Sequence, residues 1–184
     1  MQSFDYIAVL LSIVISLALA HLLIGIAHMI QDGVRRFSIP LAQWILFSLF
    51  LCVDYWFYIW QLHRETLWSL PYVCLLLFQA SIIFVAARLI VPAASDDAAI
   101  DMTAFFDRNR RKYMAVVIVL AAINEIINVS LPGFGSLHVG LLVAAWIVLF
   151  GVAYTWQSHR VQLAVAAANV MLTLHYAMTF VPAL

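Results

Sequence analysis

Long apolar stretches recur along this chain and are separated only by short polar breaks. A helix needs about 20 mostly apolar residues to cross the hydrocarbon core of a bilayer. Six stretches qualify: residues 5–31, 39–62, 69–91, 112–131, 137–156 and 159–182. Because they use most of the 184 residues, we expect no soluble catalytic domain among them. The sequence therefore predicts one all-α domain, a polytopic membrane protein built as a bundle of six transmembrane helices.

Composition and charge narrow the class of protein further. Hydrophobic residues make up 66% of the chain and charged residues only 10%, whereas roughly a quarter of a soluble domain is charged. Nine basic side chains balance nine acidic ones, so no nucleic-acid partner is indicated. Cys52 and Cys74 lie inside apolar stretches, which argues against a disulfide or zinc framework. The first stretch continues well past Ala20 and begins with Asp5, so we expect it to be retained.

The basic residues predict an orientation. With six spans, eight of the nine fall on one side of the membrane and only Arg64 on the other. The positive-inside rule then places both termini on the non-cytoplasmic side. Trp44 and Tyr113 lie near the inner ends of their spans, where aromatic side chains anchor helices at the interface.

The longest break predicts an additional element. Ser95, Asp96 and Asp97 are helix-capping residues, and apolar residues follow at helical spacing. We expect a short amphipathic helix over residues 96–111 on the cytoplasmic surface. Its basic end would contact anionic lipid headgroups through Arg108, Arg110, Arg111 and Lys112. The alternative is a stop signal without lipid specificity.

Three ionisable residues are predicted at one depth in the membrane. With a rise of about 1.5 Å per residue, Asp54, Glu125 and His175 all lie slightly outward of the midplane. Such residues are costly in hydrocarbon and mark ion or proton pathways. With Asn128 and Tyr58 they form a candidate pathway for protons or small cations. They could instead only tie helices together by hydrogen bonds, or hold a metal ion, which no ligand spacing supports.

Helical phase divides these polar residues into stripes. Asp54 and Tyr58 share one face of the second stretch with Gln43. In the last stretch, Asn169, Thr173 and Tyr176 share a face, while His175 points elsewhere. This difference in phase argues against a single cavity that contains every polar residue.

Small residues at helical spacing predict close helix contacts. They are Gly25 in the first stretch and Gly140, Ala144 and Gly151 in the fifth. Such faces pack within a bundle or mediate self-association, so a homo-oligomer or a membrane partner protein remains open. His21 and His28 share the face of Gly25; haem ligation is one interpretation, but their depths match poorly.

No motif predicts catalysis or a cofactor. A zinc-protease motif, a glycine-rich phosphate loop and a nucleophile elbow are all missing from the sequence. The leading hypothesis is a channel or transporter-like protein for protons or small cations. The alternative is a non-catalytic membrane module that binds a partner protein or lipid. A lipid-modifying activity that uses Asp54, Glu125 or His175 also stays open.

Three short segments carry a resemblance. They are Trp68-Ser69-Leu70-Pro71, Leu89-Ile90-Val91-Pro92, and Ile100-Asp101-Met102 leading to Phe105-Phe106 and Arg110-Arg111. Over about the middle half of the chain, the sequence resembles uncharacterised bacterial multi-span membrane proteins. Trp56 and Trp60 match the tryptophan-rich second helix of such proteins, without their frequent Trp-Trp pair. The resemblance implies a bacterial inner-membrane location and no agreed activity.

Overall fold

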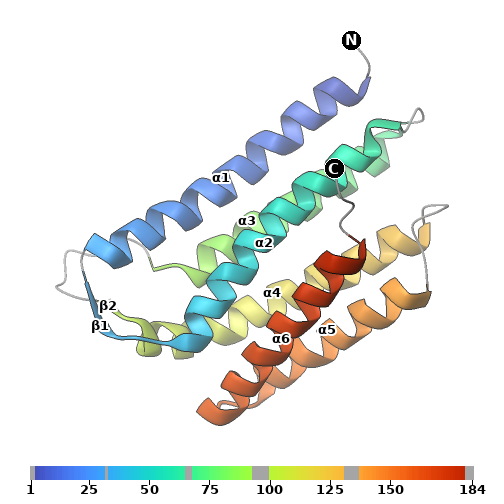
Figure 1. Ribbon diagram of the computed structural model, residues 1–184. Helices are drawn as coiled ribbons and strands as arrows, with labels where there is room; N and C mark the ends of the chain where they lie inside the picture. The colour runs from blue at the N-terminus through green and yellow to red at the C-terminus, as the bar shows by residue number, and fades with distance from the viewer. Residues whose placement is uncertain (1–2, 32, 65–67, 93–99, 131–136, 181–184) are drawn as a thin grey trace.

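A computed structural model describes residues 3–31, 33–64, 68–92, 100–130 and 137–180 of the chain. This described part consists of helices, two short strands, one 3-10 turn and short connections. The elements are α1 (Ser3–Gln31), β1 (Val34–Arg36), α2 (Ile39–Gln61), η1 (Leu62–Arg64), α3 (Leu70–Ile90), β2 (Ile100–Asp101), α4 (Met102–Ser130), α5 (Leu137–Thr155) and α6 (His159–Phe180). The predicted all-α fold is therefore confirmed. The helices run roughly side by side, with β1 and β2 at one end of the bundle (Figure 1).

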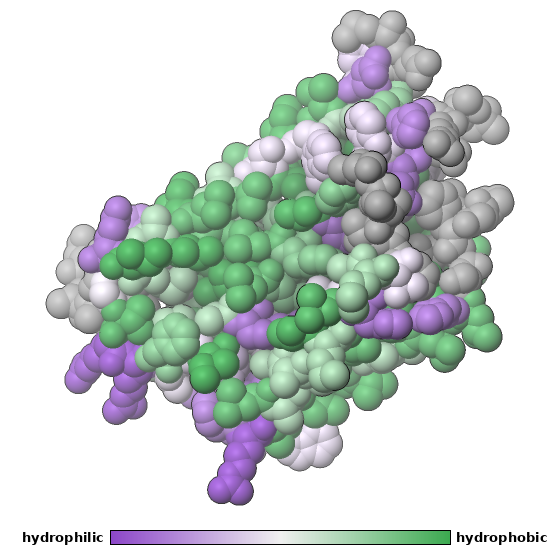
Figure 2. Space-filling view, viewed as in Figure 1, coloured by the Kyte–Doolittle hydropathy of each residue, from purple (hydrophilic) through white to green (hydrophobic). Residues whose placement is uncertain are grey.

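Five helices are long and apolar enough to cross a membrane, namely α1, α2, α3, α5 and α6. Their bounds differ from the predicted stretches by at most two residues at either end. Apolar residues cover most of the visible face along the helices, and hydrophilic residues gather toward the two ends (Figure 2). The chain is thus a multi-pass membrane protein by the length and composition of its helices.

Helix α4 differs from the prediction. We expected a surface helix over 96–111 followed by a span over 112–131, but Met102–Ser130 is one continuous helix. Residues 96–99 lie outside the described residues. The apolar residues of the expected surface helix belong to a stripe that continues into the bundle and is buried throughout. This stripe comprises Met102, Phe106, Tyr113, Met114 and Val117. Continuous burial of one face explains why the helix has no break at residue 111.

Serine caps and prolines begin two of the helices. The Leu41 backbone N–H donates to Ser38 Oγ at 3.4 Å, and the Tyr72 backbone N–H donates to Ser69 Oγ at the same distance. A proline lies in the first turn of both α2 and α3. Proline suits this position because its missing N–H would have no partner in the helix. The same local pattern therefore begins both helices.

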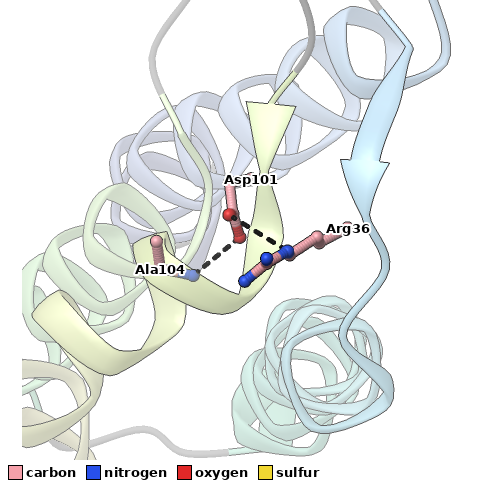
Figure 3. Close-up of polar contacts among 3 residues, drawn as sticks. All are labelled: Arg36, Asp101 and Ala104. Atoms are coloured by element: carbon pink, nitrogen blue, oxygen red, sulfur yellow. Dashed lines mark hydrogen bonds and ion pairs between the residues drawn. The ribbon is translucent and has the colours of Figure 1, made fainter.

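A small polar junction joins the loops at one end of the bundle. Strand β1 pairs in parallel with β2, with Val34 opposite Ile100. Asp101 caps α4 by accepting from the Ala104 backbone N–H at 2.9 Å, and its other oxygen lies 3.9 Å from Arg36 Nε (Figure 3). Gly33, with φ of 75°, makes the turn from α1 into β1. This junction links the loop after α1 to the start of α4.

An aromatic cluster fills the contact between α2, α4 and α5. The Trp44 ring packs on Phe47, Tyr113 and Phe150 with centroid distances of 5.7–5.9 Å. The hydroxyl groups of Tyr113 and Ser48 are hydrogen bonded at 2.9 Å. Trp44 and Tyr113 are both 0% exposed. The expectation that they anchor helices at the membrane interface is therefore wrong, because both side chains are enclosed by the bundle.

The predicted small-residue contacts divide into two pairs. A Cβ on Gly25 would overlap the Val91 side chain, and one on Gly140 would lie 3.0 Å from Glu125 Oε1. By contrast, a Cβ on Gly151 would meet no described atom within 4 Å, and Ala144 is exposed. Gly25 and Gly140 thus permit close packing inside the bundle. Ala144 and Gly151 make no such close contact among the described residues, so for this part of α5 self-association stays open as the alternative.

Candidate functional site

An ionisable side chain takes part in a polar contact between helices where α2, α5 and α6 meet. Tyr176 of α6 has its ring edge-on to Phe50 of α2 at 6.3 Å and to Trp146 of α5 at 5.5 Å. Its hydroxyl group is hydrogen bonded to the half-buried carboxyl group of Asp54 on α2. Two aromatic side chains from neighbouring helices therefore hold the tyrosine, and its hydroxyl meets an intramembrane acid.

Further polar groups continue from this pair along α6. The Trp146 indole N–H donates to Asn169 Oδ1 at 3.1 Å, which links α5 to α6. Asn169 is 0% exposed, and its Nδ2 has no hydrogen-bond partner among the described residues. Thr173 lies between Asn169 and Tyr176 on the same helix face. Its Oγ1 also has no hydrogen-bond partner among the described residues. We call Asp54, Trp146, Asn169, Thr173 and Tyr176 the polar seam.

Helical spacing accounts for the polar seam. Asn169, Thr173 and Tyr176 are four and three residues apart, so they face the same direction from α6. On α2, Phe50 and Asp54 are also four apart and both meet Tyr176. The predicted stripe of Asn169, Thr173 and Tyr176 is therefore confirmed. The contact between this stripe and the Asp54 face of α2 depends on how the two helices pack, so the repeat within one helix does not predict it.

Glu125 lies at a different interface. Its Oε1 lies against Gly140 on α5, and its Oε2 has no hydrogen-bond partner among the described residues. The neighbouring Asn124 faces α3, where its Oδ1 accepts a hydrogen bond from Gln79 Nε2. Gln79 is 4% exposed, and sequence reasoning missed its role in this contact. Glu125 therefore belongs to the contact between α4 and α5, whereas Asp54 belongs to that between α2 and α6.

The other predicted pathway residues do not join one cluster. His175 faces His138 on α5, with their Nε2 atoms 3.4 Å apart. Tyr58 packs near Tyr55 on α2, with ring centroids 6.2 Å apart. The side chain of Asn128 lies outside the described residues. Within the described residues, no three His, Cys, Asp or Glu side chains are grouped closely enough to hold a metal ion. A metal site made by Asp54, Glu125 and His175 together is therefore wrong.

The histidine of the first helix has a basic partner. His21 Nδ1 lies 3.2 Å from Arg88 Nη1, which joins α1 to α3. Because a guanidinium group only donates, His21 Nδ1 must accept and its hydrogen is then on Nε2. His21 therefore makes a hydrogen bond that links α1 to α3. The interpretation of His21 as a haem ligand did not predict this bond.

One predicted headgroup contact is wrong. Arg110 is 1% exposed and donates to the carbonyl oxygens of Ala153, Tyr154 and Trp156 at the end of α5. These carbonyls lack partners inside their own helix, so a cationic donor satisfies them. Burial, and then the neighbouring Arg111, lower the pKa of the Arg110 guanidinium, but arginine keeps its charge at neutral pH. Arg108, Arg111 and Lys112 remain exposed.

Gln162 of α6 completes the cap at the end of α5, and sequence reasoning missed this role. Its Nε2 donates to Ala153 O at 3.0 Å and to Trp156 O at 2.6 Å. A signal existed for Arg110: it lies four residues after Phe106 and four before Met114, on the buried stripe of α4. For Gln162, the spacing of seven residues to Asn169 places both on one face of α6.

The polar seam contains groups that exchange protons or make hydrogen bonds. A carboxyl group exchanges a proton directly, and tyrosine and threonine hydroxyls both donate and accept hydrogen bonds. Buried polar groups with unused hydrogen-bonding capacity are otherwise unfavourable in an apolar interior. The polar seam therefore combines a carboxyl group with side chains that have hydrogen-bonding capacity to spare.

Comparisons with known proteins add no function. No protein-family model matches the chain, and neither a curated protein nor a solved structure matches it. The resemblance to bacterial multi-span membrane proteins thus stays a prediction, as does the inner-membrane location that it implies.

Proposed function

We propose that the protein is a channel or transporter-like protein that moves protons or small cations along the polar seam. One observation carries the proposal: the hydrogen-bonded pair of Asp54 and Tyr176 lies where three apolar helices meet. It continues into the buried Asn169. An ionisable side chain inside a membrane bundle marks an ion or proton path by default. The absence of a nucleotide-binding motif in the sequence is consistent with movement driven by a gradient.

The proposal includes six membrane spans, with α4 as the additional one. Helix α4 is not among the five apolar helices, and its first turns carry Asp107, Arg108 and Arg111 among other charges. From Tyr113 to Ile127, however, it carries only the charge of Glu125. An even number of spans leaves both termini on one side, and the basic residues place that side outside the cytoplasm.

Asp54 is the proton-exchanging group in this mechanism. In its neutral form the carboxyl group suits the apolar interior, and on ionisation it accepts the Tyr176 hydroxyl hydrogen bond. Thr173 and Asn169 then extend the hydrogen-bonding positions toward the start of α6. Glu125 is a second exchanging carboxylate at the contact between α4 and α5, with His175 as an outer relay. Tyr58 and Asn128 keep the supporting role that the sequence predicts for them.

Replacing Asp54 by asparagine is expected to abolish proton movement. The amide keeps the size and hydrogen-bonding capacity of the carboxyl group but cannot gain and lose a proton. Flux driven by a pH gradient should fall to the level of protein-free liposomes. The measurement is the fluorescence of an entrapped pH-sensitive dye in proteoliposomes of wild type and Asp54→Asn.

Asp107→Asn is the matched control, because it makes the same chemical change on an exposed position of α4. It should retain wild-type flux. Tyr176→Phe, which removes only the hydroxyl, should reduce flux without abolishing it. Equal flux in Asp54→Asn and wild type, with both proteins folded, would refute the role of Asp54. A loss in Glu125→Gln would extend the path to the second interface.

A second candidate function is lipid binding by exposed basic side chains. Arg108, Arg111 and Lys112 are exposed in the first turns of α4, and Arg36 is exposed nearby at the junction with Asp101. A basic side chain contributes about 1 kcal/mol of attraction to an anionic membrane surface. This cluster could recruit an anionic lipid or an acidic membrane partner without any transport.

Adding phosphatidylglycerol is expected to stabilise the wild-type protein in detergent more than it stabilises Arg108→Gln with Lys112→Gln. The expected difference is about 1 kcal/mol per removed charge. The midpoint of thermal denaturation, measured with and without the lipid, reports it. Phosphatidylcholine is the control lipid and should stabilise both proteins equally. An equal response of both proteins to the anionic lipid would contradict this function.

A further inference from the structure

His138 and His175 form an exposed pair between the first turn of α5 and the last turns of α6. Their Nε2 atoms are 3.4 Å apart, their ring centroids are 5.6 Å apart and the ring planes differ by 20°. Since the centroid separation exceeds the nitrogen separation by about two ring radii, the rings lie end to end. Both Nε2 atoms therefore face the same gap.

The helices that carry the pair are fixed to each other further along the same contact. The Trp146 indole N–H donates to Asn169 about two turns away, and the Trp146 ring packs edge-on to Tyr176. These contacts hold α5 and α6 in register. The two imidazoles are thus brought together by the scaffold and not only by their own hydrogen bond.

We infer that His138 and His175 bind a divalent transition-metal ion of the zinc, copper or nickel class. Imidazole nitrogens are preferred ligands of these ions. Two Zn–N bonds of about 2.05 Å at a tetrahedral angle separate the nitrogens by about 3.3 Å. The observed 3.4 Å already matches this spacing. Each ring needs only to tilt by about 35° so that both lone pairs point at one ion beside the line that joins them.

When two neutral rings bind the metal ion, one of them must change tautomer. No proton is released overall. In the pair as it stands, one Nε2 carries a hydrogen and the other accepts it. In the metal complex both Nε2 atoms donate lone pairs to the ion, and both rings carry their hydrogen on Nδ1.

The pair supplies two ligands, and the other coordination positions are open at the surface of the helix bundle. Both histidines are exposed, and His138 borders an open groove of about 440 Å³ with Leu137, Leu141 and Leu142. No third His, Cys, Asp or Glu joins the pair within the described residues. An accessible site with two nitrogen ligands binds borderline ions and discriminates against Ca²⁺ and Mg²⁺, which prefer oxygen ligands.

Isothermal titration of the full chain in lipid nanodiscs with Zn²⁺ tests the site. Wild type should bind one ion, whereas His138→Ala and His175→Ala should each lose affinity by at least about tenfold, the loss known for weakened metal shells. His159→Ala removes an exposed histidine at the start of α6 and should bind as wild type. Ca²⁺ at the same concentration should give no heat of binding.

A second readout covers variants that fail to fold. Cu²⁺ added to wild type should give an electron paramagnetic resonance spectrum with couplings to two imidazole nitrogens. Wild type without Zn²⁺ binding, or single variants that bind Zn²⁺ as tightly as wild type, would overturn the inference. So would a Cu²⁺ spectrum without paired nitrogen couplings. None of these measurements depends on proton flux, so the site is tested separately from the proposed function.

Discussion

Replacing Arg110 by methionine is expected to lower the free energy of unfolding by about 3 kcal/mol, since hydrogen bonds to a charged group contribute about 1.5–3 kcal/mol each. Methionine keeps the length of the side chain but donates no hydrogen bond. The carbonyl oxygens of Ala153, Tyr154 and Trp156 lose a shared cationic donor at the end of α5. Gln162 still donates to two of them, so Tyr154 O loses the most.

Arg111→Met is the matched control for this prediction. Arg111 is exposed, and its guanidinium lies 5.9 Å from the centroid of the Tyr154 ring. Such a contact contributes about 0.5–1 kcal/mol, so the control should be only slightly destabilised. Unfolding by a denaturing detergent, followed by tryptophan fluorescence, measures both variants. Equal destabilisation of the two would show that Arg110 acts only as a surface charge.

Replacing Gly25 by alanine is expected to destabilise the contact between α1 and α3 by about 1–3 kcal/mol, the usual cost of overpacking. The added methyl group would overlap the Val91 side chain at Cγ1 and lie 3.0 Å from Val91 Cβ. Valine is short and branched, so it cannot move away without shifting the end of α3. Gly25→Val should be more damaging still. The same detergent unfolding measures the loss.

Gly151→Ala is the control with the opposite expected sign. No described atom lies within 4 Å of a Cβ built on Gly151, and alanine is favoured over glycine in a helix by about 0.5–1 kcal/mol. This variant should therefore be as stable as wild type or slightly more stable. A marked loss of stability in Gly151→Ala would indicate that the face of Gly151 and Ala144 packs against a second copy of the chain.

The separation of the polar residues changes how the transport hypothesis should be tested. Equal depth suggested that Asp54, Glu125 and His175 act together. In the structure, each meets a different partner: Tyr176, the backbone at Gly140, and His138 respectively. Asp54, Glu125 and His175 should therefore each be substituted singly, with flux measured for each variant. Residues at the same depth in a membrane can point in different directions from their helices, so equal depth does not bring them together.

Periodicity within single helices predicted part of the candidate site. The shared face of Asn169, Thr173 and Tyr176 follows from the 3.6-residue repeat alone, and so does the divergence of His175 from that face. The pairing of Asp54 with Tyr176 did not follow, because it depends on α2 packing beside α6 with α3, α4 and α5 between them in the chain. The role of Arg110 was mistaken because basic residues near a span were all assigned to the membrane surface.

Sequence alone is enough to predict a multi-pass helical membrane protein. It also predicts where five apolar helices begin and end and which residues share a helix face. These properties are local: they depend on apolar length, capping serines and helical repeat. The enclosure of Trp44 and Tyr113, the cap that Arg110 makes on α5 and the contact between His138 and His175 depend instead on how the helices pack. In lipid, the outward and inward faces of a helix are both apolar, so hydrophobicity does not select which helices become neighbours.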